Sequence, residues 1–222
     1  MDDITLTEAV HSQRATRHFS KRPVSAADVG TILKAAIRAP SGGNRQPWRF
    51  IVIRDRDTKR RLGEWYLDAW MSSVEESMRG HEAYRSGEDL GKGMADIPVV
   101  ILVCMDRSVG VGGPLAVTQG SSVYPAVQNL LLTARSLGLG TVLTTLHTLH
   151  EHEIKDLLGI PDHVDTAALI PLGYPAEGER FGPTTVETPP SLILRRRSGS
   201  RRRHVEEVTF FERWGAVRET AT

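Results

Sequence analysis

The stretch that decides the fold spans Ala39–Trp48 and reads APSGGNRQPW. Its proline ends the helix before it, because the residue that precedes a proline is pushed out of the helical conformation. The two glycines let a backbone approach a flat ligand closely, and Ser41, Asn44 and Gln46 supply hydroxyl and amide groups. A purely structural reading, a glycine turn that leads into a strand, does not explain why the turn is so polar. We therefore treat this stretch as one wall of a ligand site.

The segments on either side of this stretch are predicted to be a helix and a strand. Ser25, followed three residues later by Asp28, has the form of a helix N-cap, and apolar residues then recur at helical spacing. After the stretch, Trp48–Ile53 is rich in aromatic and β-branched residues and predicts a strand. The polar turn thus connects two core elements.

Further along the chain, helices and strands are predicted to alternate. Apolar runs rich in β-branched residues predict strands, and apolar residues at helical spacing predict helices. The predicted strands are Pro98–Met105, Thr141–Thr145 and Thr166–Leu172, and the predicted helices are Lys59–Met78, Ser121–Leu137 and Glu151–Leu158.

Two segments interrupt this alternation. Arg79–Met94 is rich in glycine and charge and is predicted to be a mobile connection. From Pro175 onward, Gly, Pro, Thr and Arg dominate, so residues 176–222 are predicted to form an arm on the surface or on a neighbouring subunit. We therefore expect one layered α/β domain over residues 1–222, with a lid at about residues 59–95 and a C-terminal arm.

Composition narrows the classes of function. A chain of 222 residues with 40% hydrophobic and 25% charged residues can bury its own core. The net charge of +1 gives no global field that would recruit nucleic acid or an acidic membrane. The single cysteine, Cys104, cannot form an internal disulfide, and no apolar run reaches the roughly 18 residues that span a bilayer. We expect a cytoplasmic protein that does not bind membranes.

A second polar cluster lies near the N-terminus, where Gln13–Phe19 reads QRATRHF. Arg14 and Arg17 would point to a similar side if the segment were helical. Guanidinium groups suit phosphate because their planar fork donates two hydrogen bonds in one plane. The alternative is a pair of solvated surface arginines.

Together these motifs resemble the nitroreductase family of FMN enzymes, which includes the iodotyrosine deiodinases and the enzymes that make dimethylbenzimidazole. The family has an arginine-rich segment, a helix, a turn like APSGGNRQPW and a strand, in the order and spacing found here. The likeness continues through Val127–Leu130, Gly138–Gly140, Ile154–Pro161 and Leu172–Pro175. It implies an α+β fold with a central, mostly antiparallel sheet flanked by helices, in an intertwined homodimer.

The resemblance also implies a set of cofactor contacts. Arg14 would contact the FMN phosphate, and Arg17 would lie at the ring edge where negative charge collects on reduction. The Ser41 turn would reach the ring from the partner subunit, and the C-terminal arginines would return to the phosphate. The expected cofactor-binding residues are Arg14, Arg17, Ser41, Gly42, Asn44, Thr144, Thr145, Arg202 and Arg203.

This chain departs from the family pattern at several positions. Gln13 stands where the family has an arginine and Ala15 where it has a serine, so one phosphate contact and one hydroxyl are missing. Enzymes that fragment flavin have an aspartate at the Ala15 position, which disfavours that chemistry here. Deiodinases grip an amino-acid zwitterion with a Glu, Tyr and Lys set, and the candidates here, Glu82, Tyr84 and Lys92, do not keep that spacing.

The lid carries aromatic residues that would pack on the core or line the substrate pocket. We expect Trp65, Trp70 and Tyr84 to contact a flat substrate. The resemblance implies an FMN-dependent oxidoreductase that moves electrons from NAD(P)H to a small electron-poor aromatic acceptor, a nitro compound or a quinone, in two half-reactions. No catalytic side chain is expected, because the cofactor carries the redox chemistry.

The sequence allows four other interpretations. Reductive dehalogenation, or another flavin reaction on a specific aromatic metabolite, is the alternative within the enzymes, and a non-catalytic flavin-binding or flavin-sensing protein is the alternative outside them. The basic run Arg195–Arg203 could bind nucleic acid, but it lacks interleaved aromatic residues and we assign it to the flavin phosphate and a solvated tail. His147, His150 and His152 do not follow a recognised zinc spacing, so no metal is expected.

Overall fold

The computed structural model describes residues 4–75, 82–110, 118, 120–182, 207–210 and 212–214. The chain divides into two compact units, Met1–Val186 and Glu187–Thr222. In the second unit the rings of Phe210 and Trp214 pack with their centroids 4.7 Å apart. The elements below belong to the first unit, and the expectation of one domain over the whole chain stays a prediction.

The first unit is organised around one antiparallel sheet. Its strand order is β1-β2-β4-β3, and each neighbouring pair is antiparallel. This confirms the expected, mostly antiparallel sheet. The strands are β1 (Trp48–Ile53), β2 (Val99–Asp106), β3 (Gly140–Thr141) and β4 (Val164–Gly173).

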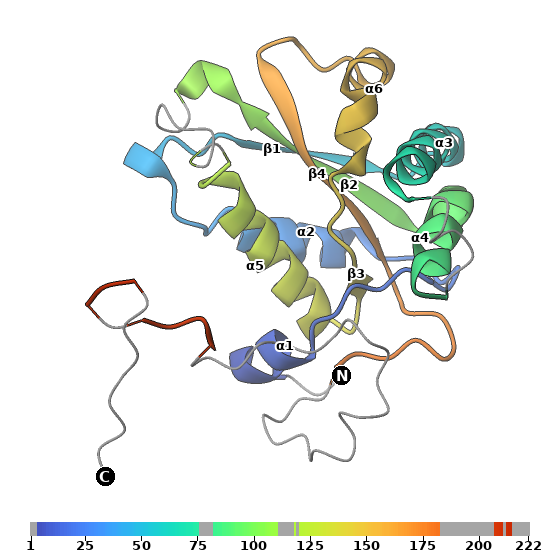
Figure 1. The fold of residues 1–222 in the computed structure, drawn as a ribbon, viewed down its shortest axis with the longest axis horizontal. Coiled ribbons are helices and arrows are strands. Elements are labelled where there is room, and N and C mark those ends of the chain that lie inside the picture. Colours follow the sequence, from blue (N-terminus) through green and yellow to red (C-terminus); the bar gives the residue numbers. More distant parts are fainter. Residues whose placement is uncertain are drawn as a thin grey trace. The chain divides into compact units, whose positions relative to one another are not determined.

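Helices cover both faces of the sheet, so the unit has three layers (Figure 1). Each residue of β2 is buried, because successive side chains point to opposite faces and both faces are covered. Val99, Ile101 and Val103 pack against α2 (Ala26–Ala36) and α5 (Val123–Ser136). On the other face the sheet packs against α3 (Arg56–Ser73), α4 (Glu82–Gly93) and α6 (Glu151–Leu158).

The helix ends follow the sequence signals. Ser25 accepts a hydrogen bond of 2.9 Å from the backbone N–H of Asp28 and so caps α2. Gly138, with φ of 73°, follows α5 in the left-handed conformation that glycine adopts at little cost. The predicted helices around α2, α5 and α6 are confirmed.

The prediction of a mobile connection at Arg79–Met94 is wrong over Glu82–Gly93, which forms α4. The glycines in this segment allow close contact between helices. A Cβ atom on Gly87 would overlap the ring of Trp70, and one on Gly91 would lie 3.0 Å from the ring of Tyr66. Glycine is used here because α4 lies directly on α3, and sequence alone could not distinguish this from mobility.

The predicted strand Thr141–Thr145 is also too long. β3 covers only Gly140–Thr141, and Thr144 forms an isolated bridge with Leu169 of β4. The segment after α1 (Leu6–Ser12) is extended, not helical, because the backbone N–H of Thr16 donates to the carbonyl of Thr141 at 2.9 Å. This segment adds a backbone to the outer edge of β3.

Cys104 is buried in β2, and burial raises the pKa of its thiol to about 12.

In the described part of the chain, no helix has an apolar stretch that could cross a membrane.

Candidate functional site

The loop at residues 41–47, here called the glycine loop, contains a short 3-10 turn, η1 (Gly42–Asn44), and an unusual backbone. Gly43, Asn44 and Gln46 have φ values of 58°, 54° and 49°. Glycine and asparagine tolerate this left-handed region, whereas glutamine seldom occupies it. Such a residue persists only where surrounding contacts hold it, since the strain is on the order of 1–3 kcal/mol.

Hydrogen bonds within and beside the glycine loop supply that support. The Gln46 backbone N–H donates to Ser41 Oγ at 3.1 Å, and the Gln46 side-chain amide donates to Asn44 Oδ1 at 3.0 Å. The Gly42 N–H donates to Oγ of Ser122, the residue before α5, at 3.2 Å. Residues 42–46 are nevertheless exposed. The loop is thus a fixed polar surface.

The predicted arginines lie on the extended segment Arg14–Arg17, here called the arginine segment. In an extended chain, residues three apart point to opposite sides, so the two guanidinium groups do not face one side as they would on a helix. Nη1 of Arg14 donates to the carbonyls of His11 and Gln13 at 2.9 and 2.7 Å, at the end of α1. Arg14 is therefore held close to its own backbone.

Arg17 has a different environment. Its side chain is half-buried, and its positive charge acts on the hydroxyl of Tyr66, whose pKa burial raises. Within the described residues, no carboxylate lies within ion-pair distance of Arg17. A half-buried guanidinium without a carboxylate is suited to an anionic ligand group.

Thr144 and Thr145 differ in what they offer. The backbone N–H and carbonyl of Thr144 are both bonded to Leu169, at 3.1 and 2.9 Å, and its side chain is buried. Thr145 is exposed and precedes the short helix η6 (Leu146–His150). Of the two threonines, Thr145 is therefore the one whose groups are exposed at this edge of the sheet.

Two residues after Thr145 lies a buried histidine, His147, which the sequence analysis considered only for a metal site and discounted. His147 is 1% exposed, and neither ring nitrogen has a hydrogen-bond partner within the described residues. Burial lowers the pKa of His147 to about 4, so the ring is neutral at pH 7. No group of three or more metal-ligating side chains is found in the part of the chain that the structure describes.

The three predicted substrate-binding residues lie in the lid. The rings of Tyr66 and Trp70 stack at 6.2 Å, and the ring of Tyr84 packs on Trp70 at 6.2 Å. Trp65 stacks on His150 at 6.3 Å. Trp70 and Tyr84 therefore pack within the lid, whereas Trp65 packs on η6, and each of the three residues is partly exposed.

The glycine loop and the arginine segment lie at opposite ends of the sheet. At one end, the N–H of Asp106, the last residue of β2, donates to the carbonyl of Pro47 at 2.8 Å. At the other end, just past β4, the N–H of Ser20 donates to the carbonyl of Tyr174 at 2.9 Å. A strand of 10 residues such as β4 is about 33 Å long. One chain therefore does not bring the two groups of predicted residues together.

Arg135, in the last turn of α5, is a candidate site residue that the sequence does not indicate. Its Nε donates to Ser12 Oγ at 2.8 Å, and its guanidinium lies 3.9 Å from the centre of the Phe181 ring. Burial lowers its pKa, and among the described residues it has no carboxylate within ion-pair distance. Only the tertiary fold brings it beside α1, so no local motif could have indicated it.

These residues fit FMN, the cofactor that the resemblance implies. Arg17 and Arg135 are cations without a carboxylate partner in the described part of the chain, and such groups suit a phosphate or the electron-rich edge of a ring. The predicted contacts of Arg14, Ser41, Gly42, Asn44, Thr144 and Thr145 stay predictions. Arg202 and Arg203 lie outside the described residues.

The chain is similar to known sequences over most of its length. The model of the nitroreductase family matches residues 10–174. NADH dehydrogenase of Thermus thermophilus is 33% identical over 184 residues, which cover 76% of this chain and 86% of the relative. Iodotyrosine deiodinase 1 of Rattus norvegicus is 31% identical over 186 residues, which cover 77% of this chain and 62% of the relative.

Solved structures give the same fold. Oxidised iodotyrosine deiodinase bound to FMN and 3-iodo-L-tyrosine has a TM-score of 0.65 and 25% identity, over 81% of this chain and 93% of that one. A nitroreductase with bound FMN from Desulfitobacterium hafniense has a TM-score of 0.63 and 23% identity, over 80% of this chain and 93% of that one.

Proposed function

Because this chain belongs to the nitroreductase family, we propose that it is an FMN-dependent oxidoreductase that moves electrons from NAD(P)H to a small electron-poor aromatic acceptor, such as a nitro compound or a quinone. The observation that carries the proposal is the half-buried guanidinium of Arg17, which has no carboxylate partner in the described chain and lies on the backbone that runs beside β3. Use of NAD(P)H fits a cytoplasmic location.

When bound, FMN would supply the redox chemistry. The protein's residues would bind and orient it. Arg17 would stabilise negative charge at the ring edge, because a fixed cation in a site shielded from water interacts strongly with charge that develops there. Arg14 would turn from the α1 carbonyls toward the phosphate, and Thr145 would face the opposite ring edge. Arg202 and Arg203 would add phosphate contacts.

The position of the glycine loop is the reason to propose a homodimer. In one chain the loop is a sheet's length away from Arg17, about 33 Å along β4. A second copy would bring its own Ser41, Gly42 and Asn44 to the ring. Two such sites would form at the interface, each with arginines from one copy and a glycine loop from the other.

The lid would select the substrate. Trp65, Trp70 and Tyr84 are partly exposed aromatic residues on α3 and α4, and flat aromatic acceptors suit such side chains. The lid would also limit access of water to the ring.

Reductive dehalogenation is the second candidate, favoured by the likeness to the FMN-bound deiodinase. Two of the three residues that would bind the amino-acid group of such a substrate, Tyr84 and Lys92, already have partners in the lid. Nζ of Lys92 is 2.5 Å from Glu88 Oε1 on the same helix, and the ring of Tyr84 packs on Trp70. We therefore rank the nitro or quinone acceptor first.

Anaerobic spectroscopy separates these functions. With FMN bound, NAD(P)H should bleach the flavin absorbance and a nitroaromatic compound or quinone should restore it. Restoration by 3-iodotyrosine alone, with release of iodide, would favour the dehalogenase. A bound flavin that neither NADH nor NADPH bleaches would support a non-catalytic flavin-binding protein and contradict the proposal.

A further inference from the structure

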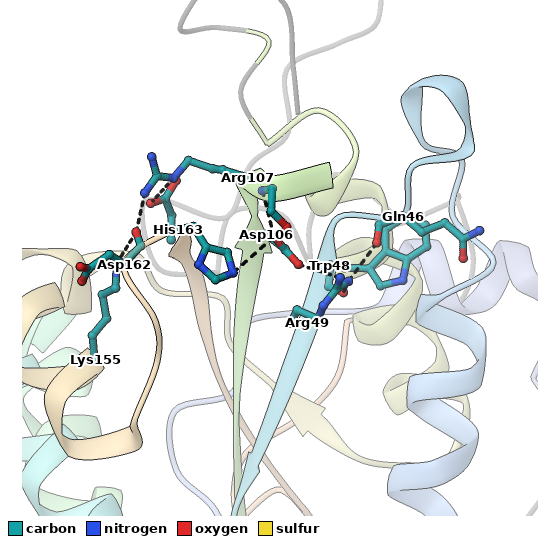
Figure 2. A network of polar contacts seen from close by, with 10 residues as sticks. Gln46, Trp48, Arg49, Asp106, Arg107, Lys155, Asp162 and His163 are labelled. Atoms are coloured by element: carbon teal, nitrogen blue, oxygen red, sulfur yellow. Dashed lines mark hydrogen bonds and ion pairs between the residues drawn. The ribbon is translucent and has the colours of Figure 1, made fainter. Parts of the chain in front are cut away.

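A network of charged side chains joins the glycine loop to the end of the sheet (Figure 2). Arg49 of β1 is its centre. Its Nη1 donates to the carbonyl of Gln46 at 3.1 Å and to that of Trp48 at 2.8 Å, and its Nη2 donates to Asp106 Oδ2 at 2.7 Å. One guanidinium thus bonds both to the loop and to the last residue of β2.

The carboxylate of Asp106 is itself fixed. Its side chain is only 10% exposed, and Oδ1 accepts from the N–H and the hydroxyl of Ser108 at 2.9 and 2.5 Å. His163 Nε2 lies 4.0 Å from the same oxygen. The backbone N–H of Asp106 also holds the carbonyl of Pro47 at 2.8 Å. Asp106 is therefore a rigid anchor for Arg49.

The contact with Gln46 is informative because of that residue's conformation. Gln46 has φ of 49°, which a residue with a long side chain adopts only when its neighbours fix it. Its N–H and its side-chain amide bond within the loop, and its carbonyl bonds to Arg49. Arg49 provides the contact that ties this strained residue to the sheet.

We propose that Arg49 and Asp106 are positioning residues, which hold the glycine loop in the conformation that completes the flavin site of a second copy of the chain. The inference rests on the proposed function, since it assigns these residues a role toward the composite site. Neither side chain would touch the cofactor. Their effect would pass through the loop to the partner's site.

Arg107 supplies a matched control at the same end of the sheet. Its side chain is 50% exposed and that of Arg49 is 49% exposed. Arg107 bonds to Asp165 Oδ1 at 3.0 Å and to the carbonyl of Asp162, and no hydrogen bond or ion pair joins its side chain to the described glycine loop. Arg107→Gln removes the same charge without loosening the loop.

The first measurement is FMN affinity, by quenching of flavin fluorescence. Arg49→Gln should bind FMN roughly tenfold more weakly, as expected for loss of charge-assisted hydrogen bonds that act indirectly. Asp106→Asn should weaken binding in the same direction, and Arg107→Gln should bind like the wild type. Unchanged affinity in both Arg49→Gln and Asp106→Asn would overturn the inference.

The second measurement determines whether Arg49 acts on the flavin site that contains its own chain's Arg17 or on the site that contains the partner's. It uses mixed dimers, which are isolated by a different tag on each chain. When one chain carries Arg49→Gln and the other Arg17→Gln, both defects fall in one site and the other site is intact. When one chain carries both changes and its partner is wild type, each site has one defect. We expect one tightly bound FMN per dimer in the first case and none in the second.

The reverse pattern would mean that Arg49 serves its own chain's site and would overturn the inference. General damage to the folding of the chain would remove tight binding in both arrangements, which also overturns it. A wild-type protein that takes up no FMN would overturn the proposed function itself, a result distinct from tight wild-type binding that Arg49→Gln leaves unchanged.

Discussion

The two ends of the sheet offer the cofactor different kinds of surface. The glycine loop is exposed, strained and bound mainly to itself, to Ser122 and to Arg49. The arginine segment is held by backbone pairing with Thr141, a residue far along the chain, and its neighbours are partly buried. A rigid exposed loop suits contact with a second molecule, whereas a half-buried cation suits a ligand within its own subunit. The predictions below perturb each end in turn.

The largest effect is expected from Arg17→Gln at the arginine end. Loss of a charge-assisted contact in a partly buried site should weaken FMN binding about a hundredfold, or about 3 kcal/mol. Fluorescence titration measures this, with Arg107→Gln as the control for loss of one positive charge. FMN affinity equal to that of the wild type would remove Arg17 from the site.

A change at Gly140 of β3 should disturb the same end of the sheet, because it acts on the backbone that holds the arginine segment. A Cβ atom at Gly140 would lie 2.5 Å from Thr16 Oγ1, so Gly140→Ala should push the arginine segment off β3. We expect a loss of about 1–3 kcal/mol in the free energy of unfolding, measured with urea, together with weaker FMN binding.

The control for this change is Gly30→Ala in α2. No atom lies within 4 Å of the added Cβ there, and the variant should be stabilised by about 0.5–1 kcal/mol. A Gly140→Ala protein as stable as the wild type would show that the close packing of Thr16 on β3 is not required.

The third prediction concerns pH and the buried histidine beside Thr144. The pKa of His147 falls from 6.5 to about 4 on folding, so the unfolded chain binds a proton at a higher pH than the folded chain. The buried neutral ring therefore costs no stability above about pH 6.5. As the pH falls toward 4, protonation favours the unfolded chain and the free energy of unfolding decreases. Between pH 7 and pH 5 the loss should be about 2 kcal/mol.

His147→Leu should remove that part of the pH dependence, which urea unfolding at the two pH values measures. His152→Leu, at an exposed position, should keep the dependence of the wild type. An equal fall in both variants would show that another group causes the acid sensitivity.

The smallest effect is expected in the glycine loop itself. Asn44 has φ of 54°, and Asn44→Ala should cost about 1 kcal/mol, because alanine tolerates the left-handed region less well. Asn44→Gly keeps that freedom and removes only the hydrogen bond to Gln46, so it separates the two contributions. Thermal melts should rank wild type and Asn44→Gly above Asn44→Ala, and an unchanged melting temperature in Asn44→Ala would exclude strain at this position.

Much of the fold could be predicted from local sequence patterns. β1 and α6 have the predicted bounds, and Ser25 caps α2 as expected. These features depend on residues within a few positions of one another. The glycine loop was found for the same reason, since its turn chemistry is contained in one short stretch.

The errors occur where tertiary contacts decide. The glycines of α4 resemble a mobile connection until Trp70 and Tyr66 are seen to pack against them. The arginine segment is extended because β3 offers it a free edge, and no local signal indicates that pairing.

Two parts of the candidate site depend on similar long-range contacts. The bond between Arg49 and Asp106 requires the register of β1 on β2, and the place of Arg135 beside Ser12 requires α5 to lie on α1. Polar residues that meet across the sheet or between helices leave no motif in the sequence.

The central claim is that the two ends of the sheet, taken from two copies of the chain, form one flavin site. Native mass spectrometry of the protein reconstituted with FMN tests it most directly. We predict one dominant species with the mass of two chains and two FMN molecules. A single chain that retains FMN, or a dimer that takes up none, would contradict it.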